Sequence, residues 1–134
     1  MTVTNYYAAI QLNALLGKSD HPSYSDVYLA LFTSDPGVGG SLAGEVSGGD
    51  YDRVAIEAMF PSATGGSVSN DTLIEFVVSS GIWGTVTHFG LCDGGTPGAG
   101  NLLVYAPLLP GSQYVGSGQI FKFSVGNLTL RRPT

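Results

Sequence analysis

The sequence has little charge, and positive charge is especially scarce. Charged side chains make up 11% of the 134 residues, and five Lys and Arg stand against ten Asp and Glu, which gives a net charge of −5. Soluble domains usually carry about 25% charged residues, so we expect this surface to be covered by partner proteins or kept in solution by Ser, Thr, Gly and Asn. Because phosphate binding depends on Lys and Arg, a nucleic-acid partner is not expected.

Cysteine and long apolar runs are also scarce. Cys92 is the only cysteine, so no disulfide forms within the chain and no oxidising compartment is required. The first residues, MTVTNYYAAIQLNALLG, lack the basic start of a secretion signal and are too short and too polar to cross a bilayer. We therefore expect a protein that is made in the cytoplasm and has no membrane partner.

The N-terminal segment has the pattern of a short helix. Residues 6–16 contain neither Gly nor Pro, Thr4 or Asn5 is suited to cap the N-terminus, and Gly17 follows the last turn. This pattern predicts one short N-terminal helix. Four residues are expected on its buried side: Tyr7, Ile10, Ala14 and Leu15.

The remainder of the chain alternates between short apolar runs and Gly-rich turns. The apolar runs lie at residues 27–32, 53–60, 73–78, 83–92, 102–106, 119–125 and 128–130. In the second run, Arg53 and Glu57 are expected opposite an apolar face formed by Val54, Ile56 and Ala58. With 43% hydrophobic residues, the chain is expected to form a single β-rich structural domain over residues 1–134. The predicted fold is mainly β, an antiparallel β-sandwich or small barrel of about seven strands with the helix at one end or edge.

Residues 83–94, WGTVTHFGLCDG, hold the only Trp and Cys and one of two His. Their β-branched and aromatic residues are typical of a strand, on which His88 and Cys92 would lie about 13 Å apart along one face. That separation is too large for two ligands of one zinc ion or for a nucleophile and its base. We therefore expect a buried, inert Cys92, a hydrogen-bonded His88, and no catalytic residue, metal or cofactor. The more buried face is predicted to comprise Trp83, Thr85, Thr87, Phe89 and Leu91.

A second group of polar residues surrounds the sequence Ser47-Gly48-Gly49. Glu45, Asp50 and Asp52 lie close together in the chain, as carboxylates that bind calcium or cleave glycosides would. Their spacing follows no regular ligand pattern, and Asp is common in Gly-rich turns because it bonds to the local backbone. The turn-forming role is therefore the favoured interpretation.

Four segments in order resemble a known family. They are VYLALFTS at 27–34, EVSGGxYxRV at 45–54, WGTVTHFGL at 83–91 and GNLLVY at 100–105. Over roughly residues 5 to 130, the chain resembles the small virion proteins of tailed bacteriophages that are usually labelled "phage tail fibre protein". Residues 114–118 depart from that pattern, because they lack the Gly-Asp turn expected before the last strands. The resemblance implies a β-rich structural component of the virion without catalytic residues or cofactors.

The fibre label fits the sequence only in part. A long fibre usually contains coiled coil, collagen-like repeats or a β-helix, and the sequence has none of these repeats. Compact β-sandwich proteins also serve as capsid cement in tailed phages. We therefore expect a capsid cement or decoration protein, a homotrimer that contacts the major capsid protein and copies of itself. A tail fibre or tail-tip component, with tail proteins as partners, is the alternative.

Partner contacts are expected outside the strands, in the N-terminal helix, the loop at 37–52 and the C-terminal Arg pair. The candidates are Tyr6, Tyr7, Glu45, Asp50, Tyr51, Arg131 and Arg132. A carbohydrate-binding adhesion module is a further alternative, with Tyr51, Tyr105 or Tyr114 as platforms on which sugar rings stack. The competing interpretation is that these aromatic rings pack in the core.

Overall fold

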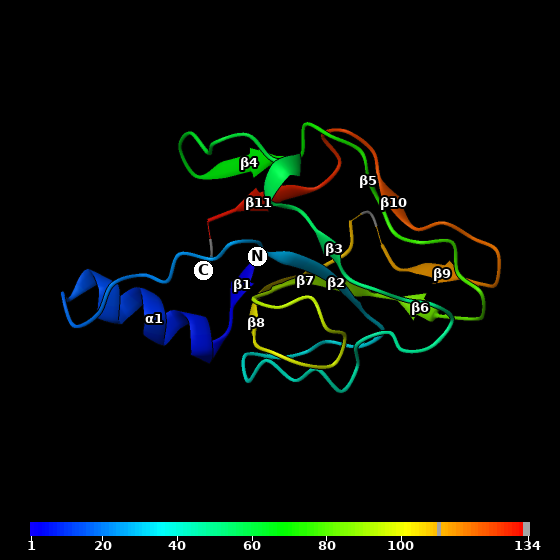
Figure 1. Ribbon diagram of the computed structural model, residues 1–134, viewed down its shortest axis with the longest axis horizontal. Helices are drawn as coiled ribbons and strands as arrows, with labels where there is room; N and C mark the ends of the chain where they lie inside the picture. The colour runs from blue at the N-terminus through cyan, green and yellow to red at the C-terminus, as the bar shows by residue number, and fades with distance from the viewer. Residues whose placement is uncertain (110, 133–134) are drawn as a thin grey trace.

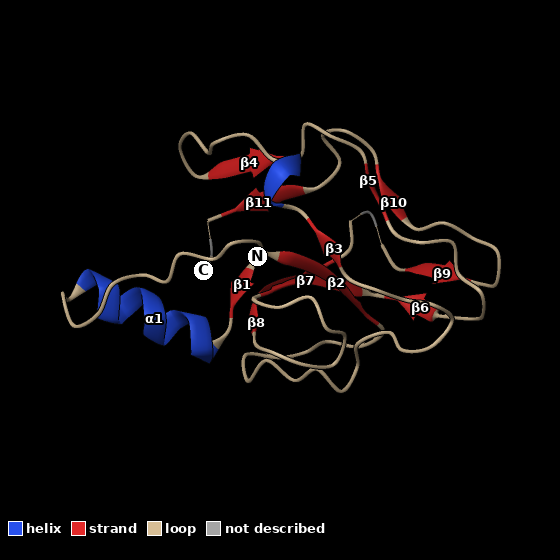
Figure 2. Ribbon diagram, in the orientation of Figure 1, coloured by secondary structure: helices blue, strands red, loops and turns tan. Residues whose placement is uncertain are grey.

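The computed structural model describes residues 1–109 and 111–132. Pro110, which lies in one of the turns predicted between the apolar runs, and residues 133–134, the end of the predicted domain, lie outside the described residues. The described residues form eleven short strands, one α-helix and one 3₁₀-helix, η1, at Glu57–Met59. The mainly β fold with a short N-terminal helix is thereby confirmed, and long loops join its elements (Figure 2).

A five-stranded antiparallel sheet lies at the centre of the molecule (Figure 1). Its strands, in spatial order, are β1 (Thr2–Val3), β8 (Leu102–Pro107), β7 (His88–Cys92), β2 (Tyr28–Phe32) and β3 (Val54–Ala55). Gly90 pairs with Ala30 on one side and Tyr105 on the other. A Cβ atom at Gly90 would lie 2.5 Å from Leu102 Cδ1, so the missing side chain lets the neighbouring strands pack closely.

Both faces of the central sheet are buried. Leu29, Leu31 and Leu91 belong to the larger apolar cluster, while Phe32 and Cys92 belong to a smaller cluster with Ala30, Leu102 and Tyr105. Burial on both faces explains why the central strands are apolar at successive positions rather than at alternate ones. From Leu29 to Phe32, successive residues of the run at 27–32 accordingly belong to the two clusters in turn.

Three two-stranded antiparallel sheets complete the β structure. They pair β4 (Ser67–Ser69) with β11 (Thr129–Arg131), β5 (Ile74–Glu75) with β10 (Lys122–Phe123), and β6 (Gly84–Val86) with β9 (Gln113–Val115). Side chains from these sheets, among them Ile74, Val86 and Val115, join the larger cluster. The sequence patterns did not predict β1, β4 or β9.

Two predicted patterns of burial are wrong in part. The run at 53–60 shortens to β3 and η1, and Arg53 is buried although it was expected opposite the apolar face. The run at 83–92 divides at Thr87 into β6, which pairs with β9, and β7, which pairs with β2 and β8. In β6 the predicted faces are exchanged, so that Val86 is buried and Thr85 is exposed, whereas Trp83, Phe89 and Leu91 are buried as predicted.

Helix α1 (Asn5–Leu15) is capped by Thr4 and projects beyond the central sheet (Figure 1). The Thr4 hydroxyl accepts a hydrogen bond from the Tyr7 amide and donates one to the Leu102 carbonyl at 2.7 Å. Gly17 has a φ of 71°, as expected after a helix end. The predicted buried stripe is confirmed only in part: Tyr7, Ile10 and Ala14 are half-buried, whereas Leu15 is 79% exposed and no residue of α1 is fully buried.

Candidate functional site

Three of the predicted contact residues, Glu45, Asp50 and Tyr51, lie in the loop at 37–52. Their surroundings differ. Glu45 and Tyr51 are buried, whereas Asp50 is exposed in a turn where its φ is 61°. The carbonyl of Gly49 in the same turn accepts a hydrogen bond from Trp83 Nε1 at 2.9 Å. A Cβ atom at Gly49 would lie 2.8 Å from that nitrogen, so the turn packs directly on the indole ring.

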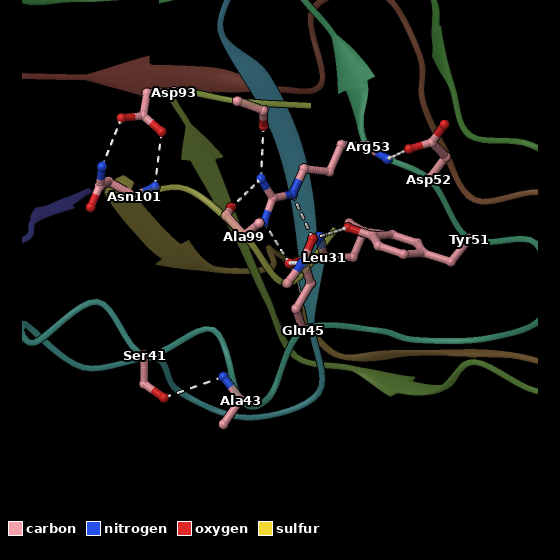
Figure 3. Close-up of polar contacts among 12 residues, drawn as sticks. Leu31, Ser41, Ala43, Glu45, Tyr51, Asp52, Arg53, Asp93, Ala99 and Asn101 are labelled. Carbon is pink, nitrogen blue, oxygen red and sulfur yellow. Dashed lines mark hydrogen bonds and ion pairs between the residues drawn. The ribbon is translucent and has the colours of Figure 1, made fainter. Parts of the chain in front are cut away.

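Glu45 lies in a buried ion pair with Arg53 (Figure 3). The two Glu45 oxygens accept hydrogen bonds from Arg53 Nη2 at 2.7 Å and Arg53 Nε at 2.8 Å. They also accept bonds from the Gly98 amide and the Tyr51 hydroxyl, each at 2.8 Å. The carboxylate therefore has two charged and two neutral donors, with no accessible oxygen left for a metal ion or a substrate.

The same network joins three segments that are distant in the sequence. Arg53 Nη1 donates hydrogen bonds to the carbonyls of Gly94 and Ala99, at 2.7 and 3.0 Å. The Tyr51 hydroxyl accepts a hydrogen bond from the Leu31 amide of β2 at 3.0 Å. The loop at 41–53 is thus fastened to the central sheet and to the turn at 94–99, which is a structural role.

The pKa shifts of Glu45 and Tyr51 agree with a structural role for this network. Burial by itself raises the pKa of Glu45, but hydrogen bonds from Arg53, the Gly98 amide and Tyr51, with the Arg53 charge, lower it below its usual value. Burial and the neighbouring Glu45 carboxylate raise the pKa of the Tyr51 hydroxyl. Glu45 and Tyr51 are therefore not presented to a partner, which corrects their assignment as contact residues.

The reactive-looking residues of 83–94 have the surroundings that the sequence predicted. Cys92 has no exposed surface, and burial raises the pKa of its thiol to about 12, so the sulfur remains protonated and unreactive near neutral pH. His88 Nδ1 is hydrogen bonded to the Thr87 hydroxyl at 2.8 Å. Asp93 closes the following turn by accepting bonds from the backbone and side-chain nitrogens of Asn101 (Figure 3).

The two ends of the chain place the remaining candidates near the surface. Tyr6 is exposed on α1, while Tyr7 is partly buried and its hydroxyl is hydrogen bonded to His21 Nε2 at 2.8 Å. Arg131 and Arg132 were expected in a tail outside the strands, but Arg131 belongs to β11 and the Arg132 amide donates to the Gly66 carbonyl at 2.7 Å. Both Arg side chains are exposed, and their role as contacts stays a prediction.

Of the three aromatic platforms considered for carbohydrate binding, only one is accessible. Tyr51 and Tyr105 are buried in the core, as the competing interpretation expected. Tyr114 on β9 is 56% exposed. Of these three, only Tyr114 is accessible for a stacking contact with a sugar.

Exposed apolar residues collect at two places that the sequence analysis did not single out. The first is α1, where Leu12, Leu15 and Leu16 are exposed. The second, which we call the tip, consists of segments 77–82 and 114–120 and carries exposed Val77, Val78, Ile82, Tyr114 and Ile120. Hydrogen bonds from the Ser79 amide to the Gln119 carbonyl and from the Gly118 amide to the Ser79 carbonyl hold its segments together.

The tip and α1 lie at opposite ends of the molecule (Figure 1). Neither residues 5–16 nor the two tip segments contain a charged side chain. Other long stretches, such as residues 58–70 and 94–121, also lack charge, so the sequence alone did not identify either surface. Such uncharged and partly apolar surfaces are suited to contacts with other proteins.

The described part of the chain contains no group of three or more His, Cys, Asp and Glu arranged to hold a metal ion. Within residues 1–109 and 111–132, no helix has the length and apolar character needed to span a membrane. No curated protein is significantly similar to the chain. A family model described as "Podophage GP4 fiber I protein gp80" matches residues 2–131.

Proposed function

The chain belongs to the podophage GP4 fiber I protein gp80 family of bacteriophage structural proteins, and we propose that it is a non-enzymatic subunit of the tail fibre apparatus. The observation that carries this proposal is the match over residues 2–131, which covers the central sheet, α1 and the tip together. The involvement of Glu45 in a structural network and the burial of Cys92 support a structural role rather than a catalytic one.

The two uncharged surfaces also support a subunit that contacts other proteins. In the proposed role, α1 and the tip contact neighbouring subunits, which include copies of this chain and other tail proteins. A compact subunit of this kind would contribute one module to a fibre rather than its whole length, since the sequence contains no fibre-forming repeat.

A second candidate function is capsid cement. The observation that favours it is the same lack of coiled-coil, collagen-like or β-helix repeats in the sequence. In this role a homotrimer would contact the major capsid protein and stabilise the head lattice. The exposed side chains of Arg131 and Arg132 are candidates for contacts with acidic groups of the capsid.

Antibody labelling of intact particles distinguishes these functions. A gold-labelled antibody against the purified chain would be viewed on intact virions by electron microscopy, with particles assembled without the chain as the control. Label on the fibres is the expected result. Label spread over the heads would establish the cement function instead, and particles without label would overturn both.

A further inference from the structure

The few basic side chains of the folded chain are distributed unevenly. Arg53 is buried in an ion pair, and the other four Lys and Arg are exposed. Three of these four line adjoining hollows on the surface: Lys122, Arg131 and Arg132. None of the ten Asp and Glu of the chain lines the same hollows. The charged side chains on this part of an acidic protein are therefore all positive, and they attract anionic groups.

The hollows adjoin one another through shared residues. The central one, which we call the apolar hollow, has a volume of about 220 Å³ and is lined largely by apolar side chains, among them Phe89, Leu108 and Leu128. Arg131 lines both the apolar hollow and a second hollow of about 500 Å³ that includes Arg132. Phe123 lines both the apolar hollow and a third hollow of about 350 Å³ that includes Lys122. We call the three hollows together the basic groove.

The local structure holds Arg131 and Arg132 at the groove. Arg131 lies opposite Ser67 in the pairing of β11 with β4, and the Arg132 amide donates to the Gly66 carbonyl at 2.7 Å. A Cβ atom at Gly66 would lie 3.6 Å from Arg132 Cδ, so the aliphatic part of this side chain packs against the turn before β4. The ion pairs among the described residues join other side chains. The two guanidinium groups are therefore held close together without an Asp or Glu to balance them.

This combination of charge and apolar surface favours an acidic peptide segment as the occupant. A guanidinium group binds a carboxylate through two parallel hydrogen bonds, and an apolar hollow accepts one apolar side chain as an anchor. Because Arg131 lines the apolar hollow as well as the neighbouring one, the anchor and a carboxylate must lie next to one another in the ligand. An acidic polysaccharide or a free phosphate would supply the negative charge but no apolar anchor.

We propose that the basic groove binds an extended acidic segment of another protein. One apolar side chain of that segment occupies the apolar hollow, and the flanking Asp or Glu side chains bind Arg131, Arg132 and Lys122. The proposal deepens the proposed function by naming the chemistry of one partner, and it rests on that function for the premise that the chain contacts other tail proteins.

A nuclear magnetic resonance titration of the full chain tests the proposal. The probe is the synthetic peptide Asp-Glu-Leu-Glu-Asp with both ends blocked, added at low ionic strength. The peptide is expected to bind with a Kd below about 1 mM and to shift the amide signals of β11 and Phe89 most. Because exposed charges are screened by salt, binding is expected to weaken as sodium chloride is added.

Protein variants test the contribution of the basic side chains. Arg131→Gln/Arg132→Gln is expected to weaken binding at least about tenfold. Lys18→Glu is the matched control, because it changes the net charge by the same two units at an exposed residue outside the groove and is expected to bind like the wild type. Lys122→Gln is expected to have a smaller effect than the Arg variant, since Glu75 lies opposite Lys122 in the pairing of β10 with β5.

Altered ligands test the two parts of the groove separately. Replacing the central Leu of the peptide by Ser removes the anchor, and replacing its Asp and Glu by Asn and Gln removes the charge; each change is expected to weaken binding at least about tenfold. Polygalacturonate and inorganic phosphate are expected to leave the Phe89 signal unshifted.

Four results would overturn the proposal: no binding of the Leu peptide, equal binding by the Arg variant, an equal loss in the Lys18→Glu control, or equal affinity for the Ser peptide. Polygalacturonate that bound as tightly as the peptide would also overturn it, because the groove would then be a general anion site.

The outcome is separable from that of the labelling experiment. Labelled fibres together with a chain that does not bind the peptide would overturn the groove proposal alone. Peptide binding in the groove without label on the fibres would overturn the proposed function alone.

Discussion

The loop at 41–53 and helix α1 distribute polar and apolar side chains in opposite ways. In the loop, the charged side chains of Glu45 and Arg53 are 2% and 0% exposed, while in α1 the apolar side chains of Leu12 and Leu15 are 57% and 79% exposed. The difference shows that burial follows from whether a side chain finds partners for its atoms. Glu45 and Arg53 satisfy one another and nearby backbone groups, and the leucines of α1 find no apolar surface within their own chain.

Removing one member of the buried ion pair is expected to have the largest effect. Arg53→Met leaves the Glu45 carboxylate buried without its two charged hydrogen bonds, which typically lowers the free energy of unfolding by about 3–5 kcal/mol. Urea unfolding of Arg53→Met measures the loss. Arg132→Met serves as the matched control, because this exposed Arg is expected to change stability by less than about 0.5 kcal/mol.

The double variant Glu45→Gln/Arg53→Met sharpens the same comparison. It removes both charges, so the cost of an unpaired buried charge disappears and the double variant is expected to be more stable than Arg53→Met. If the double variant were as unstable as the single one, shape and the bonds to Gly94 and Ala99 would matter more than charge.

A buried and an exposed leucine provide the next comparison. Leu31 has no exposed surface and belongs to the larger apolar cluster, so Leu31→Ala is expected to lower the free energy of unfolding by about 2–5 kcal/mol. Leu15→Ala, at an exposed site, is expected to change it by less than about 0.5 kcal/mol in the monomer. Thermal and urea unfolding at low protein concentration measure both. A large loss for Leu15→Ala under these conditions would mean that α1 is covered within a single chain.

The connection between the sheet and α1 is expected to depend on Thr4. Its side chain caps the helix and donates to a carbonyl of β8, so Thr4→Ala is expected to cost about 1–2 kcal/mol. Thr4→Ser keeps the hydroxyl and is expected to retain most of the stability. Urea unfolding followed by circular dichroism measures the two variants, and an equal loss for both would point to the methyl group rather than to the hydrogen bonds.

The sequence predicted the parts of the fold that depend on local pattern. The strands at Tyr28–Phe32 and Leu102–Pro107 lie in uninterrupted apolar runs because both of their faces are buried. The short polar strand β4 has no such pattern, since its pairing with β11 joins segments about sixty residues apart. The exposure of α1 was not predictable either, because apolar residues lie on nearly all its sides and no single buried side can be selected.

Long-range contacts limited the prediction of the candidate site in the same way. Arg53 alternates with apolar residues and was therefore expected on a solvent-exposed face, yet its partners include the carbonyls of Gly94 and Ala99, more than forty positions away. In contrast, the inert surroundings of Cys92 were predictable, because a central strand in an apolar run is buried on both faces. Spacing along one strand was sufficient to separate Cys92 from His88.

Lowering the pH is expected to reduce the stability of the fold gradually, because Glu45 becomes protonated. The pKa of Glu45 in the folded chain lies below its ordinary value of 4.5, so the carboxylate binds protons less readily when folded than when unfolded. Its contribution to stability is therefore complete above about pH 4.5 and is lost as the pH falls through the folded value, by no more than about 1.4 kcal/mol per pH unit. Urea unfolding between pH 6 and pH 3 measures this slope.

The double variant Glu45→Gln/Arg53→Met is expected to show a smaller slope, because the exposed carboxylates that remain gain little from folding. Equal slopes in the two proteins would show that the buried pair does not govern acid stability, and that the contrast between the loop and α1 concerns packing rather than charge.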